Sequence, residues 1–231
     1  ICCSLILLAL LSGCARLPDY ALPRSGAIID DPAILSEAVT YRQLTRSDFK
    51  ASTLPQERVM HSDSIHAHTC ARIRPTKDSK FTINRVRFGG SWAFFGSIQT
   101  IGFEAVMFPA CSWWNPAMPA HMHRYVLQHE QIHFAIAELT ARRLTADARL
   151  KTKAFIAIQP TSKAVREEIT ATVNKWIQSA MTESLALHTD FDEDTSMYPS
   201  PRWQQWWQEK IEKQLSELQP QAPAKRRNGQ P

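Results

Sequence analysis

The chain has 231 residues, of which 44% are hydrophobic, and it carries a net charge of +5. That length is enough for one domain of about 150–200 residues with its own core, together with terminal appendages. The basic residues are spread along the sequence, and only residues 225–227 form a run. A nucleic-acid-binding protein would concentrate positive charge on one face, so we expect no nucleic-acid partner.

Residues 1–13 form an apolar stretch that is too short to span a bilayer, which needs about 20 residues. Such a stretch is typical of the apolar region of a signal peptide. It leads into Leu-Ser-Gly-Cys14, which resembles a bacterial lipobox, where the cysteine is acylated and the preceding segment is removed. We therefore expect a periplasmic, lipid-anchored protein, and Ala15 in place of an Asp favours the outer membrane of a Gram-negative bacterium. The alternative is an ordinary secretory signal, which also predicts export.

Export decides how the cysteines are interpreted. Cys2 and Cys3 would leave with the signal segment, and Cys14 would carry the lipid. Only Cys70 and Cys111 then remain in the mature domain. In an oxidising compartment an isolated pair is more often bridged than free, so a Cys70–Cys111 disulfide is predicted.

The sequence predicts one folded domain over residues 36–218. A tether at 14–35, which contains three prolines, precedes it, and a disordered tail at 219–231 follows it. Strands are predicted before the first long helix, with a break at Gly89 and Gly90. They cover residues 39–44, 61–73, 81–88 and 100–108. Short connections between them favour an antiparallel sheet of three to four strands.

Three helices are predicted after the sheet. No Gly or Pro occurs from 120 to 151, so one long helix is expected there. A second is expected at about 163–187 and a third at about 201–218. The third carries a tryptophan set at helical spacing, Trp203, Trp206 and Trp207, which is typical of a packing face. The predicted fold class is therefore α+β.

The long helix contains the motif His129-Glu130-x-x-His133, the arrangement of many zinc hydrolases. Residues four apart lie on one helical face, so both imidazoles can reach one Zn²⁺ ion. Glu130 lies about 100° further round the helix, where it can take a proton from a water on the metal. We expect His129 and His133 to be metal ligands and Glu130 to be the catalytic base.

Glu138 is a further acidic residue on the predicted long helix. It lies about 140° from His133 around the helix axis and four residues before Arg142. It falls in a polar sector with Arg124, Gln128 and Gln131, opposite the histidines. We therefore predict a solvated ion pair with Arg142 and not a third ligand.

Four segments resemble a bacterial family of domains of unknown function that are described as predicted secreted zinc-dependent proteases. Its members show Leu-Thr-Trp-x-Asp-Phe, a helix with His-Glu-Gln-x-His-Phe-x-Ile-Ala-Glu, a Tyr-Asp-x-x-Thr-x-His-Gly segment and a Gln-x-x-Trp helix. The corresponding segments here are residues 44–49, 129–138, 191–195 and 204–206. The resemblance implies a zincin-like fold and a zinc-dependent peptidase of the cell envelope that acts on a peptide or protein.

The chain departs from that family where a third ligand would be expected. Met197 and Tyr198 stand where the family has His-Gly. Because catalytic zinc normally uses three protein ligands, another residue is needed. The candidates are His188, Asp192, Asp190 and Glu183, with Asp192 and His188 ranked first. Two alternatives to a peptidase stay open, namely a catalytically degenerate periplasmic lipoprotein with a structural or binding role and a zinc amidase that acts on a cell-wall amide.

Overall fold

A computed structural model describes residues 37–54, 65–196 and 198–218. The predicted signal segment, the predicted lipidation site Cys14, the predicted tether at 14–35 and the predicted C-terminal tail at 219–231 all lie outside these residues. Within the described ranges, no helix is both long enough and apolar enough to cross a membrane.

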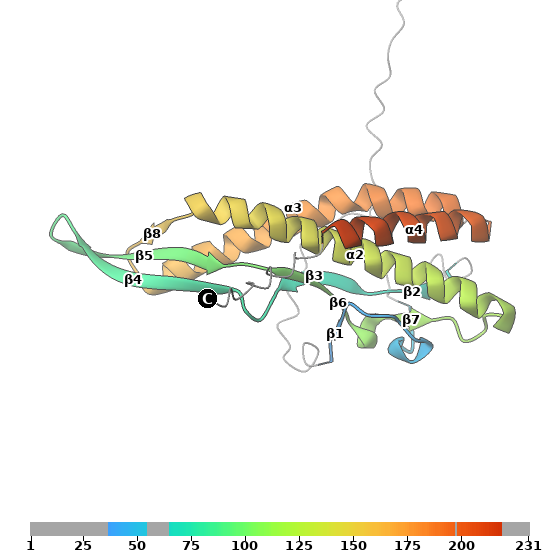
Figure 1. Cartoon of the computed structure of the whole chain (residues 1–231). Coiled ribbons are helices and arrows are strands. Elements are labelled where there is room, and N and C mark those ends of the chain that lie inside the picture. Colours follow the sequence, from blue (N-terminus) through green and yellow to red (C-terminus); the bar gives the residue numbers. More distant parts are fainter. Residues whose placement is uncertain (1–36, 55–64, 197, 219–231) are drawn as a thin grey trace, which may run out of the picture.

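The fold is α+β, as predicted, with three long helices packed as one layer against a layer of antiparallel strands (Figure 1). The strands are β1 (Val39–Thr40), β2 (Ala67–His68), β3 (Ala71–Pro75), β4 (Lys80–Phe88), β5 (Ser91–Thr100), β6 (Phe103–Met107), β7 (Trp113–Trp114) and β8 (Ala157–Gln159). The helices are α2 (His123–Lys151), α3 (Ser162–Thr195) and α4 (Pro201–Glu217), and the short 3-10 turns are η1 (Arg46–Asp48), η3 (Pro109–Cys111), η4 (Ala120–Met122) and η5 (Thr152–Ala154).

The prediction of one sheet with three to four strands is wrong, because the described strands form three small sheets. Their orders are β1-β6-β3, β2-β7 and β4-β5-β8. The sequence missed β5, where Trp92 to Phe95 are consecutive apolar residues without alternation, and β8, which is only three residues long. The strand predicted at 39–44 ends at Thr40. Beyond it, the Leu44 N–H donates to Gln131 Oε1 at 2.6 Å and not to a neighbouring strand.

β4 and β5 form a long hairpin that extends past the ends of the helices (Figure 1). Phe88 pairs with Ser91, so Gly89 and Gly90 alone make the turn. Their φ angles of 55° and 87° lie in the left-handed region, which glycine adopts without a steric penalty. Two residues with positive φ match the twist of a two-residue hairpin loop.

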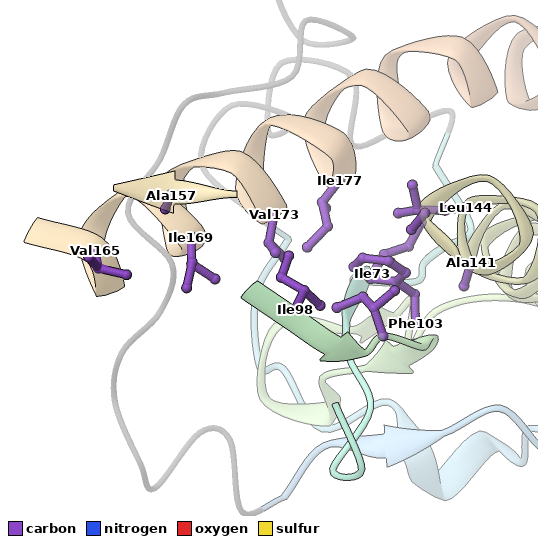
Figure 2. Close-up of a cluster of buried hydrophobic side chains, with 12 residues drawn as sticks. Ile73, Ile98, Phe103, Ala141, Leu144, Ala157, Val165, Ile169, Val173 and Ile177 are labelled. Atoms are coloured by element: carbon purple, nitrogen blue, oxygen red, sulfur yellow. The ribbon is translucent and has the colours of Figure 1, made fainter. Parts of the chain in front are cut away.

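One core cluster joins this hairpin to the helices. Val165, Ile169, Val173 and Ile177 lie in a row along α3 and face Ile98 of β5, with Ile73, Phe103 and Leu144 closing the other side (Figure 2). The spacing of the α3 residues is that of one helical face. Gly96 permits the close approach, because a Cβ there would lie 2.2 Å from Val165 Cγ1.

α2 is the central element, and it is buried all round from Phe134 to Ala141. Val126, Phe134 and Ala137 pack against the β1-β6-β3 sheet. Ile132, Ile136 and Leu139 pack on the other side against Phe191 of α3 and against α4. The predicted bounds of α2 and α4 agree with the structure to within a few residues, but α3 continues to Thr195, well beyond the predicted end at 187.

A disulfide links Cys70 to Cys111, with a Cα–Cα distance of 5.7 Å. It fixes the chain just before β3 to η3, at the end of β6. The Phe108 N–H donates to the Cys70 carbonyl beside it, and the Cys70 N–H donates to Ser112 Oγ. The bridge therefore ties the chain just before β3 to the segment that leads from β6 towards α2.

Asp48 organises the segment that follows β1. Its carboxylate accepts hydrogen bonds from both terminal nitrogens of Arg42, at 2.6 and 2.9 Å, and from the N–H of Thr45 at 2.7 Å. The hydrogen bonds from Arg42 lower the pKa of Asp48 to about 2 despite its burial, and Thr45 adds to this effect. The same segment contacts α2, since Gln131 Nε2 donates to the Arg42 carbonyl.

We predict that Asp48→Asn lowers the free energy of unfolding by about 1–3 kcal/mol at pH 7, the usual range for a charged hydrogen-bonded group. The pKa of Asp48 is lower in the folded protein, so its contribution is present above about pH 4 and is lost as the pH falls towards 2. Urea unfolding at pH 7 and pH 2.5 measures the difference between variant and wild type. Asp78→Asn, at an exposed carboxylate, is the control. A difference of the same size at both pH values would contradict the assignment.

Candidate metal centre

Three potential ligand atoms from two helices converge at one point. His133 Nε2 lies 3.1 Å from His129 Nε2 and 3.0 Å from Asp192 Oδ1. Asp192 Oδ1 is also 3.2 Å from His129 Nε2. His129 and His133 come from α2, and Asp192 comes from the C-terminal part of α3. Among the described residues, these three form a group that can hold a metal ion.

The spacing of these atoms fits a four-coordinate ion. Bonds of about 2.0–2.2 Å in tetrahedral geometry place neighbouring ligand atoms about 3.3–3.6 Å apart. The three observed separations are only slightly shorter than this. Two imidazoles and one carboxylate are also a donor set used by catalytic metal sites. A small adjustment of the side chains is enough to admit the ion.

The group is open to solvent on one side. The side chain of Asp192 is 49% exposed, whereas those of His129 and His133 are 13% and 18% exposed. A catalytic metal needs a coordination position that water or substrate can reach, while a structural site is closed by its protein ligands. The exposure of Asp192 therefore favours an accessible site.

Phe191 holds the two helices in this register. Its ring is fully buried and stacks on the His129 ring, with centroids 4.5 Å apart and an angle of 27°. It also makes edge contacts with His133 at 4.9 Å and with Trp207 of α4 at 5.7 Å. Trp207 Nε1 donates to Asp194 at 2.8 Å, which fixes the next turn of α3. The residue before the candidate ligand is thus clamped between α2 and α4.

Each histidine uses its second ring nitrogen in a separate contact. His129 Nδ1 lies 3.3 Å from Thr195 Oγ1, whose hydroxyl donates to the Phe191 carbonyl and can therefore accept from the imidazole. His133 Nδ1 lies 2.9 Å from His188 Nδ1. A proton on Nδ1 leaves the lone pair of Nε2 directed towards the shared centre, as metal binding requires.

Tyr125 fixes Thr195 in turn. Its hydroxyl donates to the Thr195 carbonyl at 2.8 Å and accepts from the Ser200 N–H at 2.9 Å. Gln204 of α4, which is fully buried, donates to the Tyr125 carbonyl at 3.0 Å. The end of α3 is therefore held by α2 and by the start of α4 at the same place.

Ionisation of the surrounding groups is consistent with cation binding. Burial acts to raise the pKa of Asp192, but when the imidazoles are protonated the charge of His133 and hydrogen bonds from His129 and His133 outweigh it and lower that pKa below its ordinary range. A metal ion at the shared centre would take the place of these Nε2 protons. Burial lowers the pKa of His188 to about 3, and the charge of His133 contributes. At neutral pH, Asp192 is a carboxylate and His188 is a neutral imidazole that can accept at Nδ1.

The two glutamates of α2 lie in different environments. Glu130 is buried next to His129, on the side of α2 that carries Val126 and Ala137 towards the sheet. Glu138 Oε1 accepts from Arg142 Nε at 2.8 Å, and its Oε2 accepts from the Ala105 N–H at 3.2 Å. The predicted ion pair with Arg142 is present, but Glu138 is buried, so the prediction that it is solvated is wrong. The backbone N–H of Ala105 in β6 donates the hydrogen bond to Glu138 that water would donate at an exposed position.

Of the four candidates for a third ligand, the structure brings Asp192 to the histidines. His188 contacts the far nitrogen of His133, while Asp190 and Glu183 are exposed. The sequence reasoning missed Thr195 and Phe191 because it ended the helix at about 187. Residues 161–198 contain no Gly or Pro, which was a signal for a longer helix. On that helix His188, Asp192 and Thr195 share one face.

No family model matches the chain, and no match was found among the curated proteins or the solved structures.

We predict that Thr195→Val weakens metal binding by about 10–100-fold, the usual effect of losing a partner that orients a ligand histidine. Valine matches the shape of threonine at this buried position but cannot accept from His129 Nδ1. Titration of the apoprotein with Zn²⁺ against a chelating dye measures the affinity, and Thr195→Ser is the control that keeps the hydroxyl. Equal affinity of the valine variant and wild type would show that the contact does not orient His129.

Proposed function

We propose that the protein is a zinc-dependent peptidase of the bacterial cell envelope. The observation that carries the proposal is the convergence of Asp192 Oδ1 on the Nε2 atoms of His129 and His133. The sequence motif supplied two ligands on one helix, and Asp192 completes the set of three that catalytic zinc normally uses. The four segments that resemble the secreted zinc-dependent proteases support the same function.

His129, His133 and Asp192 would hold the ion. When bound there, zinc would supply Lewis acidity, lowering the pKa of water and polarising the carbonyl of the substrate. Two nitrogen ligands and one carboxylate leave the complex with a net positive charge, which favours this chemistry. The open side at Asp192 is where a substrate can enter.

Glu130 would act as the general base. It adjoins His129 in the sequence and lies about 100° round the helix from it, so it can reach a water beside the ligands without being one of them. Its carboxylate would take a proton from the attacking water as the water oxygen bonds to the amide carbon. The same proton would then go to the leaving nitrogen as the C–N bond breaks. Burial of Glu130 keeps it away from bulk solvent.

The substrate class follows from the reaction and from the resemblance. A peptide bond and a cell-wall amide contain the same C–N bond, so a zinc amidase is a second candidate with the same residues. We propose a peptide or protein as the substrate because the resemblance is to proteases. Assays with a peptide library and with purified peptidoglycan distinguish the peptidase from the amidase. Hydrolysis of peptidoglycan alone would show that the protein is an amidase and not a peptidase.

We propose that the protein is exported and anchored through a lipid on Cys14, because Leu-Ser-Gly-Cys follows an apolar stretch. Mass spectrometry of the membrane-associated protein should show an N-terminal acylated cysteine. Cys14→Ser should release the protein from the detergent phase. A wild-type protein processed at another residue and recovered in the aqueous phase would refute the anchor.

We predict that Asp192→Asn lowers the affinity for Zn²⁺ by more than about a hundredfold, which exceeds the 10–100-fold effect of an outer partner. The amide keeps the size of the side chain but loses the negative charge. Asp190→Asn, at an exposed aspartate two residues away, should bind like wild type. Competition with a chelating dye measures both. If wild type itself binds no Zn²⁺ at micromolar concentration, the degenerate-lipoprotein alternative replaces the enzyme.

We predict that Glu130→Gln retains one Zn²⁺ per chain but lowers the rate of hydrolysis by about 10²–10⁴-fold, the usual contribution of a general base. His129→Ala should lose both metal and activity. Asp147→Asn, at an exposed carboxylate on the same helix, should keep both. Turnover of Glu130→Gln at the wild-type rate, with zinc bound, would place the base elsewhere.

A further inference from the structure

The hairpin and the connection between α2 and α3 form one end of the molecule. We define this basic end as residues 80–100 and 149–159. The two segments adjoin, because Phe95 of β5 pairs with Ile158 of β8. In Figure 1 the hairpin extends past the helices beside β8. The segments are far apart in the sequence and meet only through the fold.

This end carries more positive charge than the net charge of the whole chain. It contains six cations and no acidic residue, and all six are exposed: Lys80, Arg85, Arg87, Arg149, Lys151 and Lys153. The whole chain has a net charge of +5, and its other 21 basic and 22 acidic residues therefore contribute −1. The cations that are dispersed in the sequence are gathered here by the pairing of β5 with β8.

The same end exposes large apolar side chains. Nine large hydrophobic residues are exposed within the described ranges, and six of them belong to the basic end: Phe81, Val86, Trp92, Leu150, Ile156 and Ile158. Trp92 is 52% exposed, and the guanidinium of Arg85 lies 4.0 Å from its ring centroid. A cation is thus fixed against the indole while the ring stays in contact with solvent.

The combination identifies the partner class. Exposed aliphatic side chains without hydrogen-bonding groups favour an apolar medium, and tryptophan is typical of the boundary between lipid and water. Lysine and arginine near a membrane surface are attracted to anionic headgroups. A nucleic acid would satisfy the cations but not Leu150, Ile156 and Ile158. We propose that the basic end docks end-on on an anionic lipid bilayer, with the tip of the hairpin at the headgroup boundary, where Trp92 and Val86 lie on opposite faces of the paired strands.

This docking sets the position of the metal centre. His133 and Lys151 are 18 residues apart on α2, which corresponds to about 27 Å along the helix axis. The candidate metal centre therefore lies towards the opposite end of the molecule and would face away from the bilayer. The inference uses no residue of that centre and stands whether or not the protein hydrolyses amides.

Vesicle binding tests the proposal. The full chain is used with Cys14→Ser in every sample, so that no acyl anchor forms. Binding to vesicles of phosphatidylglycerol and phosphatidylcholine should exceed binding to phosphatidylcholine alone and should fall at high salt. The triple variant Arg87→Gln, Lys151→Gln, Lys153→Gln should bind about 100-fold less, since each cation contributes about fivefold. Equal binding to both vesicle types, or by variant and parent, would overturn the proposal.

Tryptophan quenching locates the contact. Lipids with brominated acyl chains should quench the fluorescence of the parent protein, and most of that quenching should disappear in Trp92→Phe. Trp203→Phe is the matched control, because Trp203 of α4 is also 49% exposed but lies outside the basic end. Loss of quenching in Trp203→Phe alone would assign membrane contact to α4. Sedimentation that shows a dimer, abolished by Val86→Ser and Ile158→Ser, would make this surface an interface between copies. Either result overturns the proposal.

Discussion

The packing of the last turns of α3 on α2 is the interaction on which the candidate site depends. The two helices run antiparallel, so a pair of residues four apart on one meets a pair four apart on the other. His129 meets Asp192, and His133 meets both Asp192 and His188. Phe191 fixes this register because its buried ring stacks on His129 and contacts Trp207. A shift of one residue between the helices would rotate Asp192 away from the histidines by about 100°.

Local spacing made part of this site predictable. His129 and His133 share a face of any α-helix, and no property of the rest of the fold is needed to bring them together. Asp192 is different, because its place depends on how far α3 continues and on how it packs. Sequence patterns alone therefore leave Asp192 as one of four candidates for the third ligand, ranked first together with His188. Thr195 was missed for the same reason, since it faces His129 only if the helix reaches residue 195.

The polar residues of α2 show where hydrophobic patterning fails. A helix with one apolar stripe is expected to expose its other face, yet α2 is buried all round at its centre. Glu138 accepts the Ala105 N–H, Gln131 accepts the Leu44 N–H, and Arg142 donates to the Leu215 carbonyl at 3.0 Å. These side chains bond to backbone groups of three different neighbours. Patterning cannot distinguish a polar residue in contact with water from one that satisfies a buried backbone group.

The grouping of the strands into one sheet was predicted wrongly for a related reason. Strand existence was visible in the alternation of residues 81–88, and the double glycine marked the hairpin turn. How strands group into sheets depends on pairing between distant segments, such as β5 with β8 or β2 with β7. The same non-local pairing places the connection between α2 and α3, which carries Lys151 and Lys153, beside the hairpin, so the clustering of positive charge at the basic end cannot be predicted from local sequence.

The layout of the helices connects the two proposed sites. α2 and α3 both extend from the basic end to the candidate metal centre, and the core cluster that contains Ile98, Leu144 and Ile177 lies between these two sites. A lipid anchor at Cys14 would be a single point of attachment, and a single point of attachment does not by itself fix the orientation of the domain relative to the membrane. A second contact through the basic end would fix the direction of the helices. The candidate metal centre would then be held at a set height above the bilayer, where a soluble polypeptide or a cell-wall polymer can reach it and a substrate embedded in the membrane cannot.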